Sequence, residues 1–104
     1  MDQKQQRLEA RIAELKAELT ALGRMRPGSL SCQARTRGSG YFQVSYSRAG
    51  KPHSDYVRPD YEPVIRAEIQ AYRRYRELTR QWVDLELELS RLTQRLAAGD
   101  QGQP

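Results

Sequence analysis

The sequence predicts an α+β fold in which long N- and C-terminal helices form an antiparallel, coiled-coil-like hairpin, with a three-stranded antiparallel β-meander inserted between them. Leucine and isoleucine recur at alternating spacings of four and three near both ends of the chain, the pattern of helices that pair along a seam. Between these segments, apolar and polar residues alternate and glycines mark turns, which indicates short strands. We expect one domain at residues 1–98 and a disordered tail at 99–104.

The first helix is predicted at residues 3–24. Strong helix formers (Ala, Glu, Lys, Gln and Arg) surround its apolar seam. Gly23 favours an end to the helix, and Pro27-Gly28 prevents any continuation. The seam consists of Leu8, Ile12, Leu15, Leu19 and Leu22.

The β-meander is predicted at residues 30–58. In YFQVSYS, the side chains of Phe42, Val44 and Tyr46 share one face, and those of Tyr41, Gln43, Ser45 and Ser47 share the other. SCQART and HSDYVR supply the flanking strands. Gly38-Ser39-Gly40 and Ala49-Gly50 supply the turns, and Pro59 ends the third strand.

The second helix is predicted at residues 61–97, with Asp60 as its cap and Pro63 tolerated in its first turn. Its apolar residues change phase between 72 and 78, so we expect its two halves to pack on different partners. A sheet of three short strands needs a cover over its apolar face. The early half, with Ile65, Ile69 and Tyr72, is the expected cover. The late half should pair with the first helix through Leu78, Trp82, Leu85, Leu89, Leu92 and Leu96.

The net charge of +5 lies in the middle of the chain. Residues 24–58 carry seven basic side chains and one acidic side chain, whereas residues 1–23 are neutral and residues 59–104 carry −1. A localised basic segment is typical of a surface that binds a polyanion.

We therefore expect a small, non-enzymatic DNA-binding protein whose sheet faces double-stranded DNA. Arginine and glutamine read guanine and adenine in the major groove, and Arg, Lys, Ser and Tyr also reach phosphates. Gln33 and Ser45 should lie on the same face of the sheet as Tyr41 and Gln43, the face that the second helix leaves open. The residues predicted to contact nucleic acid are Arg35, Arg37, Tyr41, Gln43, Arg48, Lys51 and Arg58.

Catalysis, metal binding and cofactors are not expected. Cys32 and His53 are the only cysteine and histidine, too few for a zinc site or a nucleophile–base pair. We expect Cys32 to be a small core residue and His53 to be a solvated or sheet-edge side chain.

No apolar run approaches the roughly 20 residues of a membrane span, and the N-terminus lacks an apolar signal core, so we expect a cytoplasmic protein with no membrane partner.

Three segments, MRPGSLS (25–31), GYFQVSYSRAGKPHSDYVRP (40–59) and YRRYRELTRQWVDLELELSRL (72–92), together resemble a family of short uncharacterised bacterial proteins. In that family an RGSL-like start, a GPYYxLSY-like strand, a GK turn, a YV strand and a YRRFREL helix follow in this order. Members are often encoded near transposases and other mobile-element genes, which implies a DNA-linked role. Many carry a cysteine-rich stretch where this chain has CQARTRGSG, so the resemblance lends no metal site.

Three short strands followed by a helix are also similar to the arm-type DNA-binding domain of tyrosine recombinases, which lays its sheet in the major groove. Two alternatives to duplex binding remain. One is a protein-interaction adaptor, a homodimer or a partner-helix binder, that uses the leucine seam. The other is a single-stranded nucleic-acid binder that stacks bases on Tyr41, Tyr56 and Tyr61.

Overall fold

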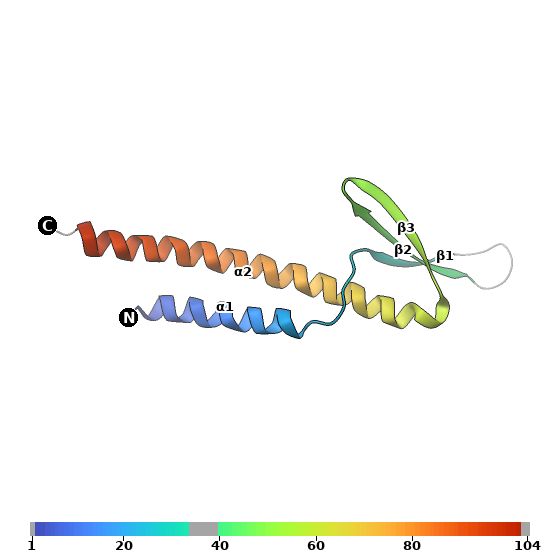
Figure 1. Cartoon of the computed structure of the whole chain (residues 1–104), viewed down its shortest axis with the longest axis horizontal. Coiled ribbons are helices and arrows are strands. Elements are labelled where there is room, and N and C mark those ends of the chain that lie inside the picture. Colours follow the sequence, from blue (N-terminus) through green and yellow to red (C-terminus); the bar gives the residue numbers. More distant parts are fainter. Residues whose placement is uncertain (1, 34–39, 103–104) are drawn as a thin grey trace. The chain divides into compact units, whose positions relative to one another are not determined.

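The computed structural model describes residues 2–33 and 40–102 and confirms the α+β fold (Figure 1). Helix α1 spans Gln3–Ala21 and helix α2 spans Glu62–Gly102. Between them lie strands β1 (Ser29–Gln33), β2 (Tyr41–Arg48) and β3 (Lys51–Val57), and one turn of 3-10 helix, η1 (Pro59–Tyr61). The sequence predicted one domain, and the structure divides the chain into two compact units. They are a helical unit (Met1–Ala21 and Tyr75–Pro104) and a sheet unit (Leu22–Arg74).

The sheet is an antiparallel meander in the order β1-β2-β3. Arg48 pairs with Lys51, so only Ala49 and Gly50 form the turn between β2 and β3. Both have positive φ, 52° and 75°, as a type I′ hairpin turn requires. This turn was predicted correctly. The other predicted turn, Gly38-Ser39-Gly40, falls largely outside the described residues.

One face of the sheet is covered by the beginning of α2, as the sequence predicted. Val44 is completely buried, and it forms an apolar cluster with Val57, Ile65 and Ile69. Burial of such side chains stabilises a fold by about 1.5–3 kcal/mol each. The half-buried side chains of Leu30, Phe42 and Tyr46 pack against this cluster.

The segment before β1 approaches β2 very closely. The backbone N–H of Arg26 donates a hydrogen bond to the carbonyl of Glu68 in α2, at 3.1 Å, which fixes the segment on the helix. Gly28 has a φ of 134°, and a Cβ atom at this position would lie 2.6 Å from Cγ1 of Val44 and 3.0 Å from the carbonyl oxygen of Ser45. Only glycine fits here without displacing the core.

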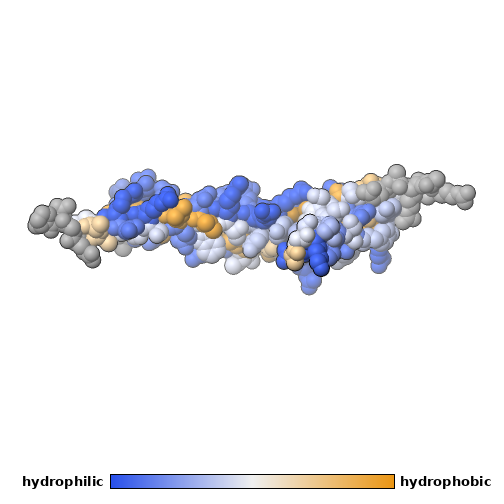
Figure 2. Space-filling model, turned by 90° about the horizontal axis from the view of Figure 1, so that it is seen from above, coloured by the Kyte–Doolittle hydropathy of each residue, from blue (hydrophilic) through white to orange (hydrophobic). Residues whose placement is uncertain are grey.

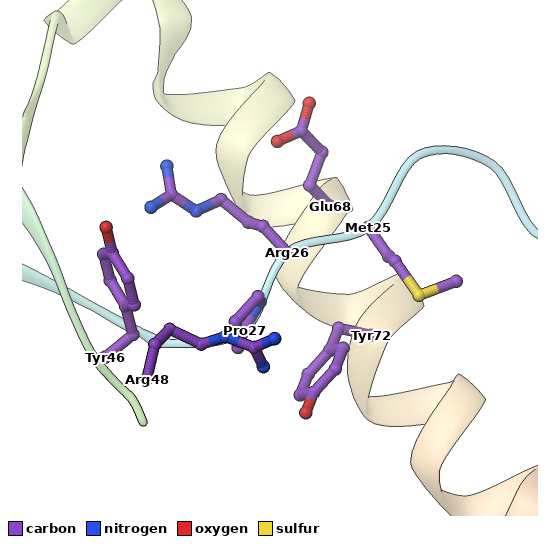
Figure 3. Close-up of a pocket in the computed structure, with 7 residues that line it drawn as sticks. All are labelled: Met25, Arg26, Pro27, Tyr46, Arg48, Glu68 and Tyr72. Carbon is purple, nitrogen blue, oxygen red and sulfur yellow. The ribbon is translucent and has the colours of Figure 1, made fainter. Parts of the chain in front are cut away.

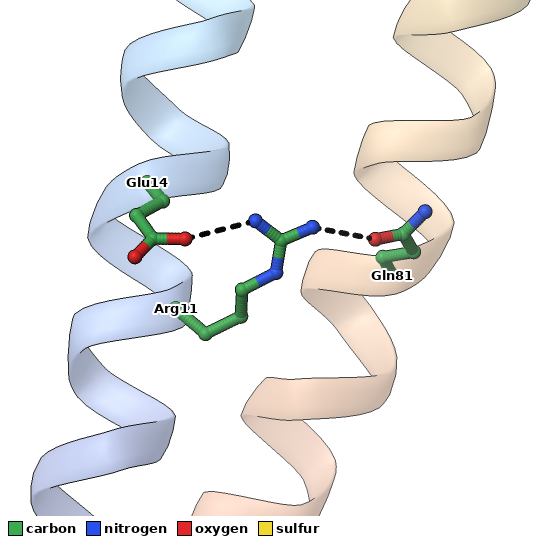
Figure 4. A network of polar contacts seen from close by, with 3 residues as sticks. All are labelled: Arg11, Glu14 and Gln81. Atoms are coloured by element: carbon green, nitrogen blue, oxygen red, sulfur yellow. Dashed lines mark hydrogen bonds and ion pairs between the residues drawn. The ribbon is translucent and has the colours of Figure 1, made fainter.

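In the helical unit, α1 and the C-terminal part of α2 run antiparallel (Figure 1). Arg11 joins them by donating a hydrogen bond to Gln81 of α2 at 3.3 Å, while its other guanidinium nitrogen donates to Glu14 within α1 at 3.0 Å (Figure 4). Lys4 pairs with Glu88 at 3.4 Å. The buried residues of the unit come from both helices and belong to the two predicted seams: Leu8, Ile12, Leu15, Leu78 and Leu92.

Several predicted details differ from the structure. Helix α1 ends at Ala21 instead of residue 24, ahead of Gly23. Helix α2 continues to Gly102 instead of ending at 97, because a single glycine at 99 costs a helix only about 1 kcal/mol. Residues 99–102 are therefore helical. Asp60 lies inside η1, where its carboxylate accepts hydrogen bonds from Arg58 at 3.2 and 2.8 Å.

Cys32 was predicted to be a core residue, and this was wrong because its side chain is exposed. Its pairing with Phe42 puts it on the same sheet face as Val44. However, it lies near the end of the edge strand β1, beyond the cluster that α2 covers.

We expect Gly28→Ala to lower the free energy of unfolding by about 2 kcal/mol or more, because the new Cβ overlaps Val44 and the backbone is left-handed. Gly23→Ala is the matched control, since a Cβ there meets nothing within 4 Å. Urea denaturation of both variants measures the difference. Equal stabilities would contradict the close approach of Gly28 to β2.

Candidate nucleic-acid interface

The face of the sheet opposite Val44, here named the open face, carries neutral polar side chains. Strand pairing aligns Ser31 with Gln43, Gln43 with Tyr56, and Ser45 with Ser54 on this face. No charged residue occupies it within the described strand residues. Its described members, by strand register, are Ser29, Ser31, Tyr41, Gln43, Ser45, Ser47, Pro52, Ser54 and Tyr56.

Gln43 lies near the centre of the open face, between Ser31 of β1 and Tyr56 of β3. The hydroxyl of Ser31 donates to the backbone carbonyl of Gln43 at 3.4 Å. The side-chain amide of Gln43 forms no hydrogen bond with the described residues, so both its donors and its acceptor are available. Such a group can pair with the edge of a base.

A pair of tyrosines lies at one end of the open face. The ring centroids of Tyr41 and Tyr56 are 6.1 Å apart, and the planes are tilted by 39°. Tyr56 is 59% exposed although it is a large aromatic residue. An exposed aromatic pair on a polar sheet is a surface on which a base can stack.

Basic residues lie at the two ends of the sheet. Arg48 and Lys51 are exposed and face each other across the hairpin turn. Arg58 directly follows β3 at the other end, where it pairs with Asp60 at 2.8 Å, and its side chain remains 74% exposed. Strand β2 has eight residues, so these ends are about 23 Å apart at ~3.3 Å per residue.

The seven predicted contact residues are thus only partly brought together. Tyr41 and Gln43 share the open face. Arg48 and Lys51 were predicted at its rim, but the pairing register places them on the side of Val44, at the tip of the hairpin. Arg58 lies at the opposite end. Arg35 and Arg37 fall outside the described residues.

The two units differ sharply in charge. The sheet unit contains ten basic and four acidic residues, for a net charge of +6, whereas the helical unit contains eight basic and nine acidic residues, for −1. The excess positive charge therefore belongs entirely to the unit that contains the sheet.

Sequence reasoning missed a cluster on the helix-side face of the sheet. Arg26 pairs with Asp55 at 2.8 Å, and its guanidinium carbon lies 5.3 Å from the centre of the Tyr46 ring. The Tyr46 ring in turn stacks on the ring of His53 at 5.2 Å. Only the strand register, which pairs Tyr46 with His53 and Val44 with Asp55, could have revealed this cluster. His53 is exposed, as predicted.

The hydrogen bond from the Arg26 guanidinium holds the pKa of the Asp55 carboxyl below its ordinary value. Burial opposes this shift, while a hydrogen bond with Tyr46 and the charges of Arg26 and His53 support it. Asp55 thus remains an anion and holds Arg26 in place over the Tyr46 ring.

A pocket of about 520 Å³ opens beside this cluster (Figure 3). Its walls come from the segment before β1, from β2 and from α2. Figure 3 shows the Arg48 side chain extending from β2 past Pro27 towards the ring of Tyr72. The lining residues are Met25, Arg26, Pro27, Tyr46, Arg48, Glu68 and Tyr72.

No group of three His, Cys, Asp or Glu side chains that could hold a metal ion occurs among residues 2–33 and 40–102. Within the same residues, neither helix has the length and apolar character needed to cross a membrane.

We expect Arg26→Gln to raise the pKa of Asp55 towards its ordinary value, because the hydrogen bond that lowers it is lost. The pKa of Asp55 is lower in the folded state than in the unfolded state, so the ion pair stabilises the fold above about pH 4. This stabilisation is lost as the pH falls through the folded-state pKa. Carbon-detected NMR titration of the carboxyl group measures the shift. Arg58→Gln, which removes the pair with Asp60, should leave the Asp55 pKa unchanged. An unchanged pKa in Arg26→Gln would contradict the assignment.

A family model described as a domain of unknown function (DUF6788) matches residues 1–67. The match covers α1, all three strands and the first residues of α2. No curated protein and no solved structure matches the chain. Because the family model matches more than half of its residues, the chain belongs to the DUF6788 family of domains of unknown function.

Proposed function

We propose that the sheet unit binds double-stranded DNA, with the open face of the sheet in the major groove. The observation that carries this proposal is the net charge of +6 in the sheet unit, whereas the helical unit carries −1. Nucleic-acid affinity comes largely from cations that neutralise phosphates. A net positive charge also steers a duplex towards the surface that carries it.

The arrangement of charge along the sheet suits a groove. Phosphates line both edges of the major groove, while base edges occupy its floor. Lys51 and Arg48 at one end and Arg58 at the other can reach phosphates, and the neutral open face between them can contact bases. Three strands span about 10 Å across the sheet at ~4.8 Å per neighbour, which the ~12 Å groove admits.

Gln43 is the residue best placed to read a base. Its amide is free among the described residues and lies near the centre of the open face. Glutamine pairs bidentately with adenine, and such a pair contributes about 1–3 kcal/mol of discrimination. The resemblance of the chain to proteins encoded near transposases favours an accessory role at a mobile element as the setting for this binding, inside the cytoplasm.

The adaptor alternative is less well supported, because the leucine seam is largely buried within one chain. Leu15 and Leu78 have no exposed surface. The large apolar side chains that remain exposed on the late half of α2 include Val83 and Leu87, one turn apart. On the face seen in Figure 2, side chains are mainly hydrophilic, with small apolar patches between them. Dimerisation or helix binding through so small a surface would be weak.

Replacing Lys51 and Arg58 with Gln should weaken binding to a random duplex and reduce the slope of log affinity against log salt by about 2, because each lost phosphate contact reduces it by about 0.9. Fluorescence anisotropy at about 50–200 mM salt measures both quantities. Arg91→Gln/Arg95→Gln is the matched control, since it removes the same charge from the helical unit. Equal loss in the two double variants would show that only net charge matters and would overturn the proposed interface.

Single-stranded nucleic acid is a second candidate, favoured by the exposed Tyr41–Tyr56 pair. If this pair stacks bases, Tyr56→Ala should weaken binding to a single-stranded oligonucleotide by about 1–3 kcal/mol while leaving duplex affinity unchanged. Tyr61→Ala is the control, because Tyr61 is 49% exposed but lies in η1, outside the sheet. Duplex and single-stranded competitors distinguish the two candidates. Equal effects of the two substitutions would exclude stacking on the open face.

A further inference from the structure

We infer that the pocket between β2, the segment before β1 and α2 binds one nucleotide, with its base against Tyr72 and its phosphate at Arg48. The pocket lies on the helix-side face of the sheet, because Tyr46 and Arg48 alternate with the residues of the open face. It therefore lies on the opposite side of the sheet from the open face proposed for the duplex, and of its lining only Arg48 also belongs to the basic ends of that interface. The choice of a nucleotide over other ring-bearing anions rests on that proposed function.

The two arginines of the pocket differ in their partners. Arg26 already has partners within the protein, because Asp55 neutralises it at 2.8 Å and its guanidinium lies over the Tyr46 ring. The guanidinium of Arg48 forms no ion pair or hydrogen bond with the described residues. Arg48 is thus the cation that can accept an anionic group of a ligand, and a phosphate matches its planar donor geometry.

Part of the pocket wall is apolar and aromatic. The ring of Tyr72, the thioether of Met25 and the ring of Pro27 line the same pocket as Arg48. In Figure 3 the carboxylate of Glu68 points away from Arg48 and Tyr72, so it does not oppose a phosphate there. A volume of about 520 Å³ lies within the range of about 300–1,000 Å³ typical of small-ligand sites.

The wall is also held in position before any ligand arrives. The backbone hydrogen bond from Arg26 to Glu68 ties the segment to α2, and the Arg26–Asp55 pair ties it to β3. Gly28 allows the same segment to contact Val44 directly. A site held in this way loses less entropy when it binds.

The test is an NMR titration of the isotope-labelled full chain with AMP, adenosine and inorganic phosphate. We expect AMP to shift the backbone amides of Met25, Tyr46, Arg48 and Tyr72, and adenosine and phosphate to bind more weakly, because each fills half of the site. Tyr72→Leu and Arg48→Gln should each weaken AMP binding by about fivefold or more. Arg91→Gln and Tyr61→Leu are the controls, and a thermal melt checks that each variant folds.

The outcomes separate this inference from the proposed function. Shifts at the pocket without duplex binding support the nucleotide site and overturn the duplex interface alone. Duplex binding without pocket shifts, or AMP shifts confined to the open face around Gln43, overturns the nucleotide site. If a single-stranded oligoadenylate causes the same shifts at lower concentration, the nucleotide belongs to a nucleic-acid chain; if only AMP does, it is a free nucleotide.

Discussion

The sheet of this protein depends on the first turns of α2, which cover one of its faces. Without a cover, the apolar side chains on one face of the meander, Val44 and Val57 among them, would be exposed to water. Ile65 and Ile69 supply this cover by packing on Val44 and Val57. This contact leaves the opposite face open, because a single helix covers one side of the sheet. The side that α2 occupies therefore decides which face of the sheet is open, and this face carries the neutral polar residues.

A second consequence is that one continuous helix serves two different cores. The early part of α2 belongs to the sheet unit, and the part from Tyr75 onwards belongs to the helical unit with α1. The border at residues 74 and 75 falls within the change of apolar phase between 72 and 78. Charge follows the same division, at +6 and −1. The excess positive charge, on which the proposed binding of a polyanion rests, therefore belongs to the sheet unit.

The two sides of the sheet have different chemistry. On the open face, the amide of Gln43 forms no hydrogen bond with residues 2–33 or 40–102 and lies between two basic ends. On the helix side, Asp55 neutralises Arg26, and the aromatic rings of Tyr46 and His53 stack beside it. The same ion pair that fixes the segment before β1 leaves Arg48 as an available cation at the pocket. The open face proposed for a duplex and the pocket proposed for a nucleotide thus lie on opposite faces of the sheet, and only Arg48 is assigned to both proposals.

Local patterns in the sequence determined the elements, the faces of β2 and the Ala49-Gly50 turn, because the periods of helix and strand act over a few residues. They also placed Tyr41 and Gln43 on one face. Only the tertiary structure decided how the strands align with the segments around them. The Arg26–Asp55 pair joins residues 29 positions apart, and periodicity contains no information on such a contact. Cys32 was misjudged for the same reason: alternation gave its face correctly, but only the position of α2 decides how far along an edge strand that face is covered.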